Sequence, residues 1–298
     1  MAVIIFDGRG EARKREQVLK HRVDSLGRAP RLMSLVFHED QGGQLYTRLK
    51  MEAALRVGIE FDREEFSLND PVEQLVPEVQ SLSQRPDVHG LLIQKPTKAV
   101  WKQVTGTHRH GEFGWWWQQL TSALAPAKDV DCLAKANLDL VYGGNWRIVP
   151  ATVKSILSIL EIALNLSNHE LTNNNELKLK QALTGTKTVV IGRSEIIGRP
   201  LAAVMTQAGA VVSLVGSQTE DLGQHTASAK IVISATGVPK LIKEDLIRPG
   251  AVVIDVGSPA GDVDFEAVKD EVAFITPVPG GVGPMTVVSL LENLVEMI

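Results

Sequence analysis

Cysteine is almost absent from this 298-residue chain, which contains only Cys132. A single cysteine cannot form a disulfide within the chain, and it cannot build the cysteine clusters that hold zinc or iron–sulfur centres. The histidine pair His108 and His110 lacks a convincing third ligand, so we predict no metal site. These features fit a reducing compartment, and we expect a cytoplasmic protein.

Long apolar runs and a strong excess of one charge are absent as well. No stretch approaches the roughly 20 apolar residues that cross a bilayer. The apolar N-terminus is broken at Asp7 and is too short for a signal peptide. The 31 basic and 35 acidic side chains leave a net charge of -4, which argues against a general nucleic-acid-binding protein. We therefore expect neither a membrane nor a nucleic acid as a partner.

The segments that are present alternate between strand-like and helical patterns, which indicates two α/β domains. In the first set, strand-like runs lie at 31–37, 60–66 and 88–94, and helical patterns at 11–26, 41–57 and 72–83. In the second set, strands lie at 188–191, 211–215, 231–235 and 251–256, with a helix at 200–208. We expect a mostly parallel sheet flanked by helices in each domain. Residues 95–127 look irregular, and the three tryptophans at 115–117 cannot all face one core.

The segment 276–286 reads T-P-V-P-G-G-V-G-P-M-T and is the most informative part of the chain. Its three prolines and three glycines are predicted to exclude both a helix and a central strand. It lies between a strand-like run at 272–275 and a helical pattern at 287–298. Glycines allow a backbone to approach a ligand, and prolines hold a loop open. We interpret the segment as a ligand-contacting loop, with an ordinary connector as the alternative.

A glycine turn follows the strand at 188–191 and opens the next helix. Its key residues are Gly192, Arg193, Ser194 and Gly198. A strand, a glycine turn and a helix N-terminus together present backbone amides to a pyrophosphate. The turn lacks the complete G-x-G-x-x-G pattern, so a tight turn without a ligand is the alternative.

The end of the next strand bears on which nicotinamide cofactor the turn accepts. NAD-binding folds commonly place an acid there, but residues 216–219 read G-S-Q-T and hold Ser217 without an acid. Arg193 is close enough in sequence to offer its charge to a 2′-phosphate. We therefore predict NADP, with NAD as the alternative. Thr236 and Gly237 end a further strand, either at the carboxyl edge that meets the cofactor or at an ordinary strand exit.

Polar residues of the first half form a candidate catalytic group. Tyr46 and Lys50 are four apart on one helix face, and a lysine beside a phenol at an apolar edge can act as acid or base. Gln94 ends a strand and is placed to orient the lysine. Asp131 lies in a turn, where it can accept two parallel hydrogen bonds from an aminopyrimidine edge. The alternatives are a lysine extended over a half-buried tyrosine, a solvated amide and a capping aspartate.

In combination these segments resemble the bifunctional methylenetetrahydrofolate dehydrogenase/cyclohydrolase family over essentially the whole chain. Tyr46 and Lys50 are similar to the family's catalytic Y-x-x-x-K. Gln94 is similar to the glutamine that opens Q-L-P-L-P, and Asp131 to the last acid of K-D-V-D-G. The turn at 192–198 is similar to G-R-S-x-x-x-G. The segment 276–286 matches the family's C-terminal signature in full and is very specific.

The resemblance implies NADP-dependent oxidation of 5,10-methylenetetrahydrofolate to the methenyl form, followed by its hydrolysis to 10-formyltetrahydrofolate. Lys50 would transfer protons in the hydrolysis, with Tyr46 and Gln94 positioning Lys50 and the folate. Asp131 would hold the pterin. Substrate contacts are also expected at Pro279 and Gly280, and cofactor contacts at Gly192, Arg193, Ser194, Gly198, Ser217, Thr236 and Gly237.

The resemblance also implies how the chain is divided. Residues 1–149 and 278–298 would form a folate-binding catalytic domain, and residues 150–277 an NADP-binding, Rossmann-like domain. Substrate and cofactor would meet in the cleft between them, and a homodimer is expected.

Departures from the family pattern gather around the predicted substrate site. Lys95 and Lys98 stand where the family has Q-L-P-L-P, Cys132 replaces a glycine, and about a dozen residues around 105–117 look inserted. We hypothesise that Lys95 or Lys98 contacts the anionic glutamate tail of folate, with solvated surface lysines as the alternative. The tryptophans are expected to serve packing or a subunit contact rather than folate binding.

Three other functions stay open at this point. The protein could retain one of the two activities, it could be a catalytically silent folate or nucleotide binder, or it could be another two-domain NADP oxidoreductase, such as one resembling shikimate dehydrogenase. The C-terminal signature argues against the last, and the retained Tyr46, Lys50, Gln94 and Asp131 argue against the silent binder.

Overall fold

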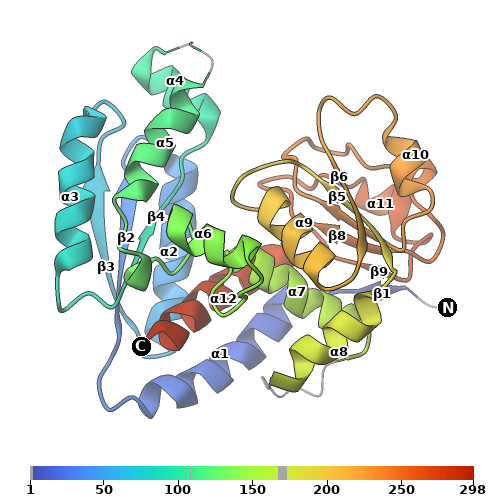
Figure 1. The fold of residues 1–298 in the computed structure, drawn as a ribbon, viewed down its shortest axis with the longest axis horizontal. Coiled ribbons are helices and arrows are strands. Elements are labelled where there is room, and N and C mark those ends of the chain that lie inside the picture. Colours follow the sequence, from blue (N-terminus) through green and yellow to red (C-terminus); the bar gives the residue numbers. More distant parts are fainter. Residues whose placement is uncertain (1–2, 108, 110, 167–172) are drawn as a thin grey trace. The chain divides into compact units, whose positions relative to one another are not determined.

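A computed structural model describes residues 3–107, 109, 111–166 and 173–298 (Figure 1). Its contacts divide the chain into two compact units. The three-stranded unit comprises Lys14–Leu140, Arg147–Ala151 and Leu290–Ile298, and the six-stranded unit comprises Met1–Arg13, Val141–Trp146 and Thr152–Ser289. Both sheets are parallel, which confirms the predicted α/β fold.

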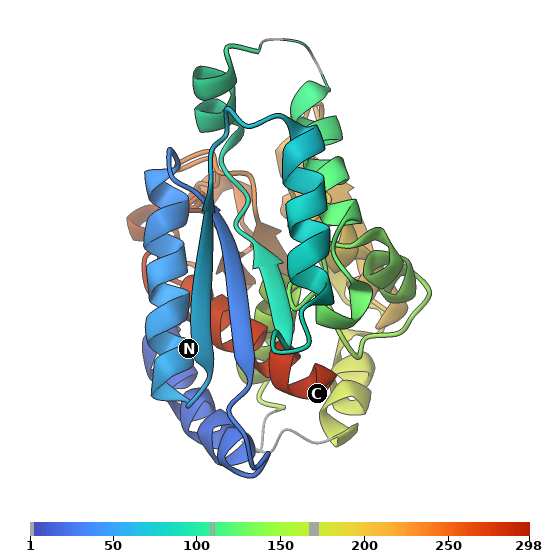
Figure 2. The same cartoon turned by 90° about the vertical axis from the view of Figure 1, so that its left-hand side faces the viewer.

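The described part of the three-stranded unit is built on a sheet with the order β3-β2-β4. Its strands are β2 (Arg31–Phe37), β3 (Glu60–Phe66) and β4 (Gly90–Ile93). Its main helices are α1 (Gly8–Asp24, which starts in the other unit), α2 (Gln41–Arg56), α3 (Val72–Gln84), α4 (Lys98–Thr105), α5 (Glu112–Ser122) and α6 (Lys135–Tyr142). The chain passes from β2 to β3 on one side of it in the sheet, and then crosses back over β2 to form β4 on the other side. Right-handed crossovers therefore place α2 and α3 on opposite faces, as Figure 2 shows.

The strand sequences explain this order. Six consecutive residues of β2 are buried and β4 is buried throughout, as expected for strands that are covered on both faces. By contrast, β3 reads E-F-D-R-E-E-F and leaves several of its charged side chains exposed. Charged side chains suit an edge strand because they oppose pairing with another chain.

The described part of the six-stranded unit has the order β1-β9-β8-β7-β5-β6. Its strands are β1 (Ile4–Ile5), β5 (Lys187–Ile191), β6 (Val211–Val215), β7 (Ile231–Ser234), β8 (Val252–Asp255) and β9 (Phe274–Ile275). Its helices include α7 (Ala151–Ala163), α8 (Asn173–Leu183), α9 (Gly198–Gln207), α10 (Leu222–Thr226) and α11 (Phe265–Val268). The core under the sheet is rich in valine and isoleucine, including Val189, Val232, Val253 and Ile275.

The sequence prediction of an irregular segment at 95–127 was wrong, because α4 and α5 form there. Aromatic packing explains both helices: the ring centroid of Trp116 lies 5.8 Å from that of Trp101 and 5.3 Å from that of Phe37. Trp116 and Trp117 are buried, whereas Trp115 is 52% exposed. The prediction that the three tryptophans do not share one core is therefore confirmed.

The C-terminal helix α12 (Val282–Met297) begins inside the segment that was expected to exclude a helix. Pro284 lies in the first turn, where a backbone N–H has no intrahelical partner and its loss costs nothing. The irregular loop is thus limited to about 276–281, and its turn is closed by a 2.9 Å hydrogen bond from the Gly281 N–H to the Pro277 carbonyl.

The N-terminal segment pairs β1 with β9, so the first thirteen residues group with the six-stranded unit. The chain crosses from one compact unit to the other after residues 13, 140, 146, 151 and 289. The predicted domain boundaries lie at 149 and 277.

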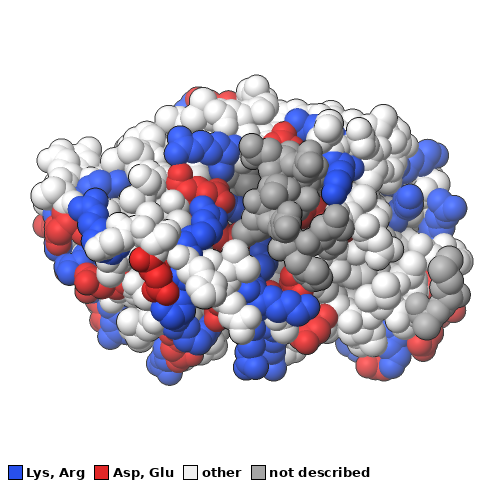
Figure 3. Space-filling model, turned by 90° about the horizontal axis from the view of Figure 1, so that it is seen from below, with Lys and Arg blue, Asp and Glu red and all other residues white. Residues whose placement is uncertain are grey.

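No helix within the described residues is long and apolar enough to span a bilayer. On the face drawn in Figure 3, basic and acidic side chains are interspersed.

Candidate active site

Lys50 and Gln94 meet inside the three-stranded unit. Lys50 lies on α2 and is only 7% exposed, and its Nζ donates a 2.8 Å hydrogen bond to Gln94 Oε1. Gln94 directly follows β4, at the carboxyl edge where the chain has reversed its direction across the sheet. Such a reversal is where open α/β sheets bind ligands. The predicted pairing of these two residues is present in the structure.

Close packing at the start of α2 makes this contact possible. A Cβ on Gly43 would lie 3.1 Å from Gln94 Cγ and 2.5 Å from the Asp40 carboxylate. Glycine at this position lets the helix approach the glutamine, a requirement that no local sequence pattern indicates.

Asp131 reaches the same edge through the segment beside β4. Leu91 and Asp129 form a parallel bridge, so the chain runs alongside β4 toward Asp131. Asp131 Oδ1 accepts a 3.3 Å hydrogen bond from the N–H of Ala151, the first residue of α7. On α12, Asn293 donates from Nδ2 to the carbonyls of Val130 and Val149, both at 2.9 Å, and thereby ties the Asp131 segment in place.

Burial sets the protonation of these groups. Loss of water lowers the pKa of Lys50, and the Asp131 carboxylate partly opposes this. Burial also raises the pKa of Asp131, against the effect of the Lys50 charge and the Ala151 N–H. Burial thus disfavours the charge on each group, whereas the charge on each favours ionisation of the other. A buried lysine with a lowered pKa is suited to proton transfer near neutrality.

Asp129 supports the turn rather than the reacting groups. This fully buried carboxylate accepts hydrogen bonds from the Leu133 N–H at 2.9 Å, the Ala134 N–H at 2.8 Å and Asn137 Nδ2 at 2.9 Å. Burial nevertheless raises its pKa to about 6.

Tyr46 lies one turn before Lys50 on α2 and is 36% exposed. It stands at the border between the buried lysine and solvent, on the helix face expected from the four-residue spacing.

Two departures from the family pattern have clear structural settings. Lys95 Nζ lies over the rings of Trp117 and Phe113, 5.0 and 5.4 Å from their centroids, so the aromatic helix α5 holds its charge. Cys132 is buried with φ of 54°, the left-handed region in which a glycine is favoured. Burial raises the pKa of its thiol well above the usual value for cysteine. Lys98 is exposed at the start of α4.

The glycine turn of the six-stranded unit lies at the point where that sheet reverses direction, between β5 and β7. Gly192 has φ of 115°, and a Cβ on it would lie 2.3 Å from the Ala235 carbonyl oxygen. A Cβ on Gly198 would lie 1.8 Å from the Gly192 carbonyl oxygen. Only glycine fits either position. The two turns therefore pack backbone against backbone at the edge where a dinucleotide binds.

The remaining predicted residues of this turn are ordered by local contacts. Ser194 Oγ accepts from the N–H groups of Ile197 and Gly198, both at 3.2 Å, at the start of α9. Arg193 is exposed, and its Nη2 donates to the Leu214 carbonyl at 3.2 Å. A Cβ on Gly216 would lie 3.2 Å from the Arg193 side chain, so that side chain crosses the end of β6. Ser217 is exposed in the following turn.

Thr236 and Gly237 follow β7, and Gly237 has φ of 71° with open space around it. Pro279 is exposed after β9, and Gly280 has φ of 107°. The structure thus brings Gly192, Gly198 and the Thr236 segment together within the six-stranded unit, and Lys50, Gln94 and Asp131 together within the three-stranded unit.

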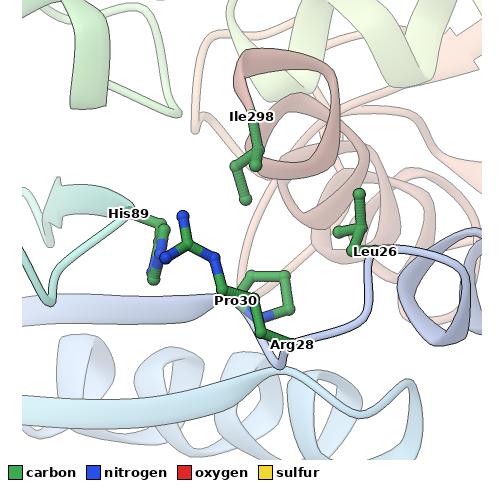
Figure 4. Close-up of a pocket in the computed structure, with 5 residues that line it drawn as sticks. All are labelled: Leu26, Arg28, Pro30, His89 and Ile298. Atoms are coloured by element: carbon green, nitrogen blue, oxygen red, sulfur yellow. The ribbon is translucent and has the colours of Figure 1, made fainter.

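A small surface pocket, drawn in Figure 4, lies away from these groups. It is lined by Leu26, Arg28, Pro30, His89 and Ile298. Pro30 and His89 precede β2 and β4, so the pocket is at the amino ends of the strands, opposite to Gln94. Within the described residues no group of histidine, cysteine, aspartate or glutamate side chains is placed to hold a metal ion, and His108 and His110 lie outside those residues.

Two family descriptions match the chain in order. The catalytic domain of tetrahydrofolate dehydrogenase/cyclohydrolase matches residues 6–131, and the NAD(P)-binding domain of the same enzymes matches residues 171–298. The bifunctional protein FolD of Methanoculleus marisnigri is 35% identical over 297 residues, which cover 97% of this chain and 94% of that protein. The chain belongs to the tetrahydrofolate dehydrogenase/cyclohydrolase family.

Solved structures of this family agree with the fold. The FolD dehydrogenase/cyclohydrolase of Campylobacter jejuni is 29% identical with a TM-score of 0.82, covering 99% of this chain and 98% of that one. The Trypanosoma brucei FolD, solved with NADP and an inhibitor, is 30% identical with a TM-score of 0.83, covering 100% and 97%. The family resemblance predicted from the motifs is therefore confirmed.

Several residues that shape these groups in this member of the family were missed by the sequence analysis. They are Gly43, Asp129, Asp255, Asp262 and Asn293. Asp129 and Asp255 hold their own turns through contacts with residues no more than eight positions away. Gly43, Asp262 and Asn293 instead contact segments that are far away in the sequence, where no local motif could indicate the contact. The one available signal was a polar residue inside an otherwise apolar run, such as Asn293 in the last helix.

Proposed function

We propose that the protein oxidises 5,10-methylenetetrahydrofolate to the methenyl form with NADP and then hydrolyses the methenyl form to 10-formyltetrahydrofolate. Membership of the family supports both reactions. The observation that carries the hydrolytic step is the buried Lys50, whose Nζ is 2.8 Å from Gln94 Oε1 and whose pKa is lowered.

For the hydrolysis, Lys50 is the proton-transfer group. A water molecule adds to the methenyl carbon, and the neutral Lys50 amine accepts the proton that the water loses. The bond from this carbon to N5 then breaks, the Lys50 ammonium gives a proton to N5, and the added hydroxyl releases its own proton to water as it becomes the formyl carbonyl. Gln94 holds the amine in place, and the Asp131 carboxylate stabilises the ammonium. Tyr46, at the solvent border of the same helix face, positions the folate.

For the oxidation, NADP supplies the hydride acceptor when it is bound. The chain's own contribution is positioning. The glycine turn fits a dinucleotide, because Gly192 and Gly198 let the turn after β5 pack closely against the turn after β7 and against the N-terminus of α9. Ser194, Thr236 and Gly237 line this edge, and Pro279 and Gly280 are assigned to the substrate.

The preference for NADP over NAD rests on charge at the end of β6. Arg193 crosses Gly216, and the turn at 216–219 carries no acid that would repel a 2′-phosphate. Arg193→Ala should raise the KM for NADP by about tenfold and change the KM for NAD little, since it removes one charge-assisted contact. Equal effects on both cofactors would refute the assignment.

Three further assignments follow from the family. We propose that the three-stranded unit binds folate and the six-stranded unit binds NADP. We propose a homodimer, which light scattering of the purified protein would test. A place in one-carbon metabolism follows from the proposed substrate, and we propose the cytoplasm as the location.

One structural observation supports the hypothesis that Lys95 or Lys98 contacts the glutamate tail of folate. Lys95 directly follows Gln94 and has its charge held in place by Trp117 and Phe113. Lys95→Ala or Lys98→Ala should raise the KM for a folate that carries a glutamate tail. Unchanged KM values in both variants would dismiss the contact.

One assay tests the proposal as a whole. Purified protein is incubated with methylenetetrahydrofolate and either NADP or NAD, and the methenyl intermediate is followed by its absorbance. Reduced nicotinamide and 10-formyltetrahydrofolate are the expected products. No reduced nicotinamide with either cofactor would exclude the dehydrogenase, and accumulation of the methenyl form would show that the cyclohydrolase is lost.

A further inference from the structure

A buried carboxylate lies directly beneath the turn that ends β7. Asp262 has no exposed surface, and its Oδ2 accepts hydrogen bonds from Ser234 Oγ at 2.8 Å, the Thr236 N–H at 2.6 Å and Thr236 Oγ1 at 2.9 Å. Three donors on one carboxylate oxygen form a charge-assisted group, which is stronger than bonds between neutral partners. The last residue of β7 and the first turn residues are therefore fixed to a single atom.

This turn is the one that faces the glycine turn of β5. Between Ser234 and Thr236 lies Ala235, whose carbonyl oxygen occupies the space that a Cβ on Gly192 would need. After Thr236 the chain passes through Gly237 with φ of 71°. A change in the Thr236 backbone would thus move both the Ala235 carbonyl and the surface offered by Gly237.

A second carboxylate fixes Asp262 itself. Asp255, at the end of β8, is 2% exposed. Its Oδ1 accepts from the N–H groups of Gly257 and Asp262 at 2.8 and 3.0 Å, and its Oδ2 accepts from the Val263 N–H at 2.9 Å. The loop after β8 is folded back by these bonds, and this brings Asp262 under β7.

We propose that Asp262 is a positioning residue for the nicotinamide dinucleotide. It holds the Ser234–Thr236 turn in the conformation that the nucleotide requires and does not contact the nucleotide itself. The inference rests on the proposed function of this edge as the cofactor site. It predicts that the residue serves the oxidation and not the hydrolysis, because Lys50, Gln94 and Asp131 belong to the other unit.

Because one oxygen of this carboxylate has no partner, two substitutions of Asp262 can separate loss of the three hydrogen bonds from loss of the charge. Asp262 Oδ1 is buried and has no hydrogen-bond partner among the described residues. In Asp262→Asn the amide oxygen can take the place of Oδ2 and keep all three bonds, whereas Asp262→Ala leaves three buried donors unpaired. Asp264→Asn is the matched control, since Asp264 lies two residues further on and pairs with Lys240 at 3.4 Å.

The experiment measures two activities of each full-length variant: nucleotide-dependent oxidation, and hydrolysis of the methenyl substrate without nucleotide. Asp262→Ala should raise the KM for the nucleotide by about tenfold or more, while hydrolysis stays within about twofold of the unmodified protein. Asp262→Asn should recover to within about threefold, and Asp264→Asn should match the unmodified protein.

The outcomes separate the inference from the proposed function. If the unmodified protein reduces no nucleotide, the proposed function fails, and calorimetric binding of NADP to the same variants then tests the inference alone. An unchanged nucleotide affinity in Asp262→Ala overturns the inference, as does an equal fall of both activities. If Asp262→Ala does not fold, Ser234→Ala removes one of the three donors and should raise the nucleotide KM about threefold. No rise in that variant overturns the inference too.

Discussion

The two candidate sites depend on different parts of the chain: buried side chains in one, and backbone without side chains in the other. In the three-stranded unit the groups that matter are buried side chains, Lys50, Gln94 and Asp131, and burial shifts the pKa of the two that titrate. In the six-stranded unit the key positions are Gly192 and Gly198, where the absence of a side chain lets backbone approach backbone. Proton transfer needs ionisable groups in a controlled environment, whereas a pyrophosphate needs amides and space.

The difference also explains where each site tolerates change. A side-chain site depends first on the reacting groups themselves, and in this chain Lys50, Gln94 and Asp131 are present although neighbouring positions hold Lys95 and Cys132. A backbone site depends on a few positions at which no other residue fits.

The largest effect is expected for Lys50→Met. Removal of the proton-transfer group should slow hydrolysis of the methenyl substrate by about a thousandfold, within the usual range for general acid–base catalysis. NADP binding should be unchanged, because Lys50 lies in the three-stranded unit. Single-turnover measurement of methenyl decay, with calorimetric binding of NADP as the control, checks both. Hydrolysis at the original rate would remove Lys50 from the mechanism.

Gly192→Ala should act in the opposite way. Its Cβ would lie 2.3 Å from the Ala235 oxygen, so the turn must move. We expect the oxidation at low NADP to fall by about a hundredfold, with hydrolysis largely retained. The matched control is Gly114→Ala on α5, where a Cβ meets nothing within 4 Å. Loss of both activities in Gly192→Ala alone would mean that the turn supports folding rather than binding.

Asp129 should make stability depend on pH. Its folded pKa is raised to about 6 from 3.8, so its contribution is fully present below about pH 4 and is lost as the pH rises through 6. Between these values the unfolding free energy of the unmodified protein should fall by about 2–3 kcal/mol relative to Asp129→Asn. Urea denaturation of both proteins from pH 4 to pH 7 measures the difference. Parallel curves would show that the pKa of Asp129 is the same in the folded and unfolded protein.

Asp131→Asn should shift the pH dependence of hydrolysis. The Asp131 carboxylate raises the pKa of Lys50, so its removal lowers that pKa further. Because the neutral amine is the active form, the rising limb of kcat against pH should move to lower pH by about one unit, a typical effect of one nearby opposite charge. Substrate KM should rise as well, since Asp131 is assigned to the pterin. A shift to higher pH would contradict the proposed coupling.

Cys132→Gly should have the smallest effect. Glycine relieves the left-handed backbone at φ of 54° but gives up a buried side chain, and these contributions offset to within about 1 kcal/mol. Asn165→Gly is the comparison, because Asn165 has φ of 55° but is exposed, so only the backbone change acts there. Denaturant titration of both variants tests the balance.

Periodic segments were predictable because their signals are local. The strands Arg31–Phe37, Glu60–Phe66 and Val211–Val215 have the bounds that the sequence predicts. The helix α4 was missed because its register depends on packing Trp101 against Trp116, which lies in a separate helix. The start of α12 was missed because Pro284 was judged as a helix breaker, although the first turn tolerates it.

Of the two sites, the residues that carry the chemistry were found more readily than those that hold them. Lys50 and Gln94 are recognisable by residue type and by the family pattern. Asp262 and Asn293 are not recognisable in this way. Asp262 lies beneath a strand that is distant in the sequence, and the Asn293 amide bridges two distant carbonyls, so no pattern of fixed sequence spacing indicates either contact. Their roles appear only once the chain is folded.

The bridge made by Asn293 has a consequence for the order of folding. Its partner Val130 lies 163 residues earlier in the chain, so the contact closes a long loop. During synthesis, the strands of the three-stranded unit can assemble long before residue 293 has been made. The segment that carries Asp131 therefore gains its last anchor late, and a newly made chain acquires its secondary structure well before it acquires a competent site.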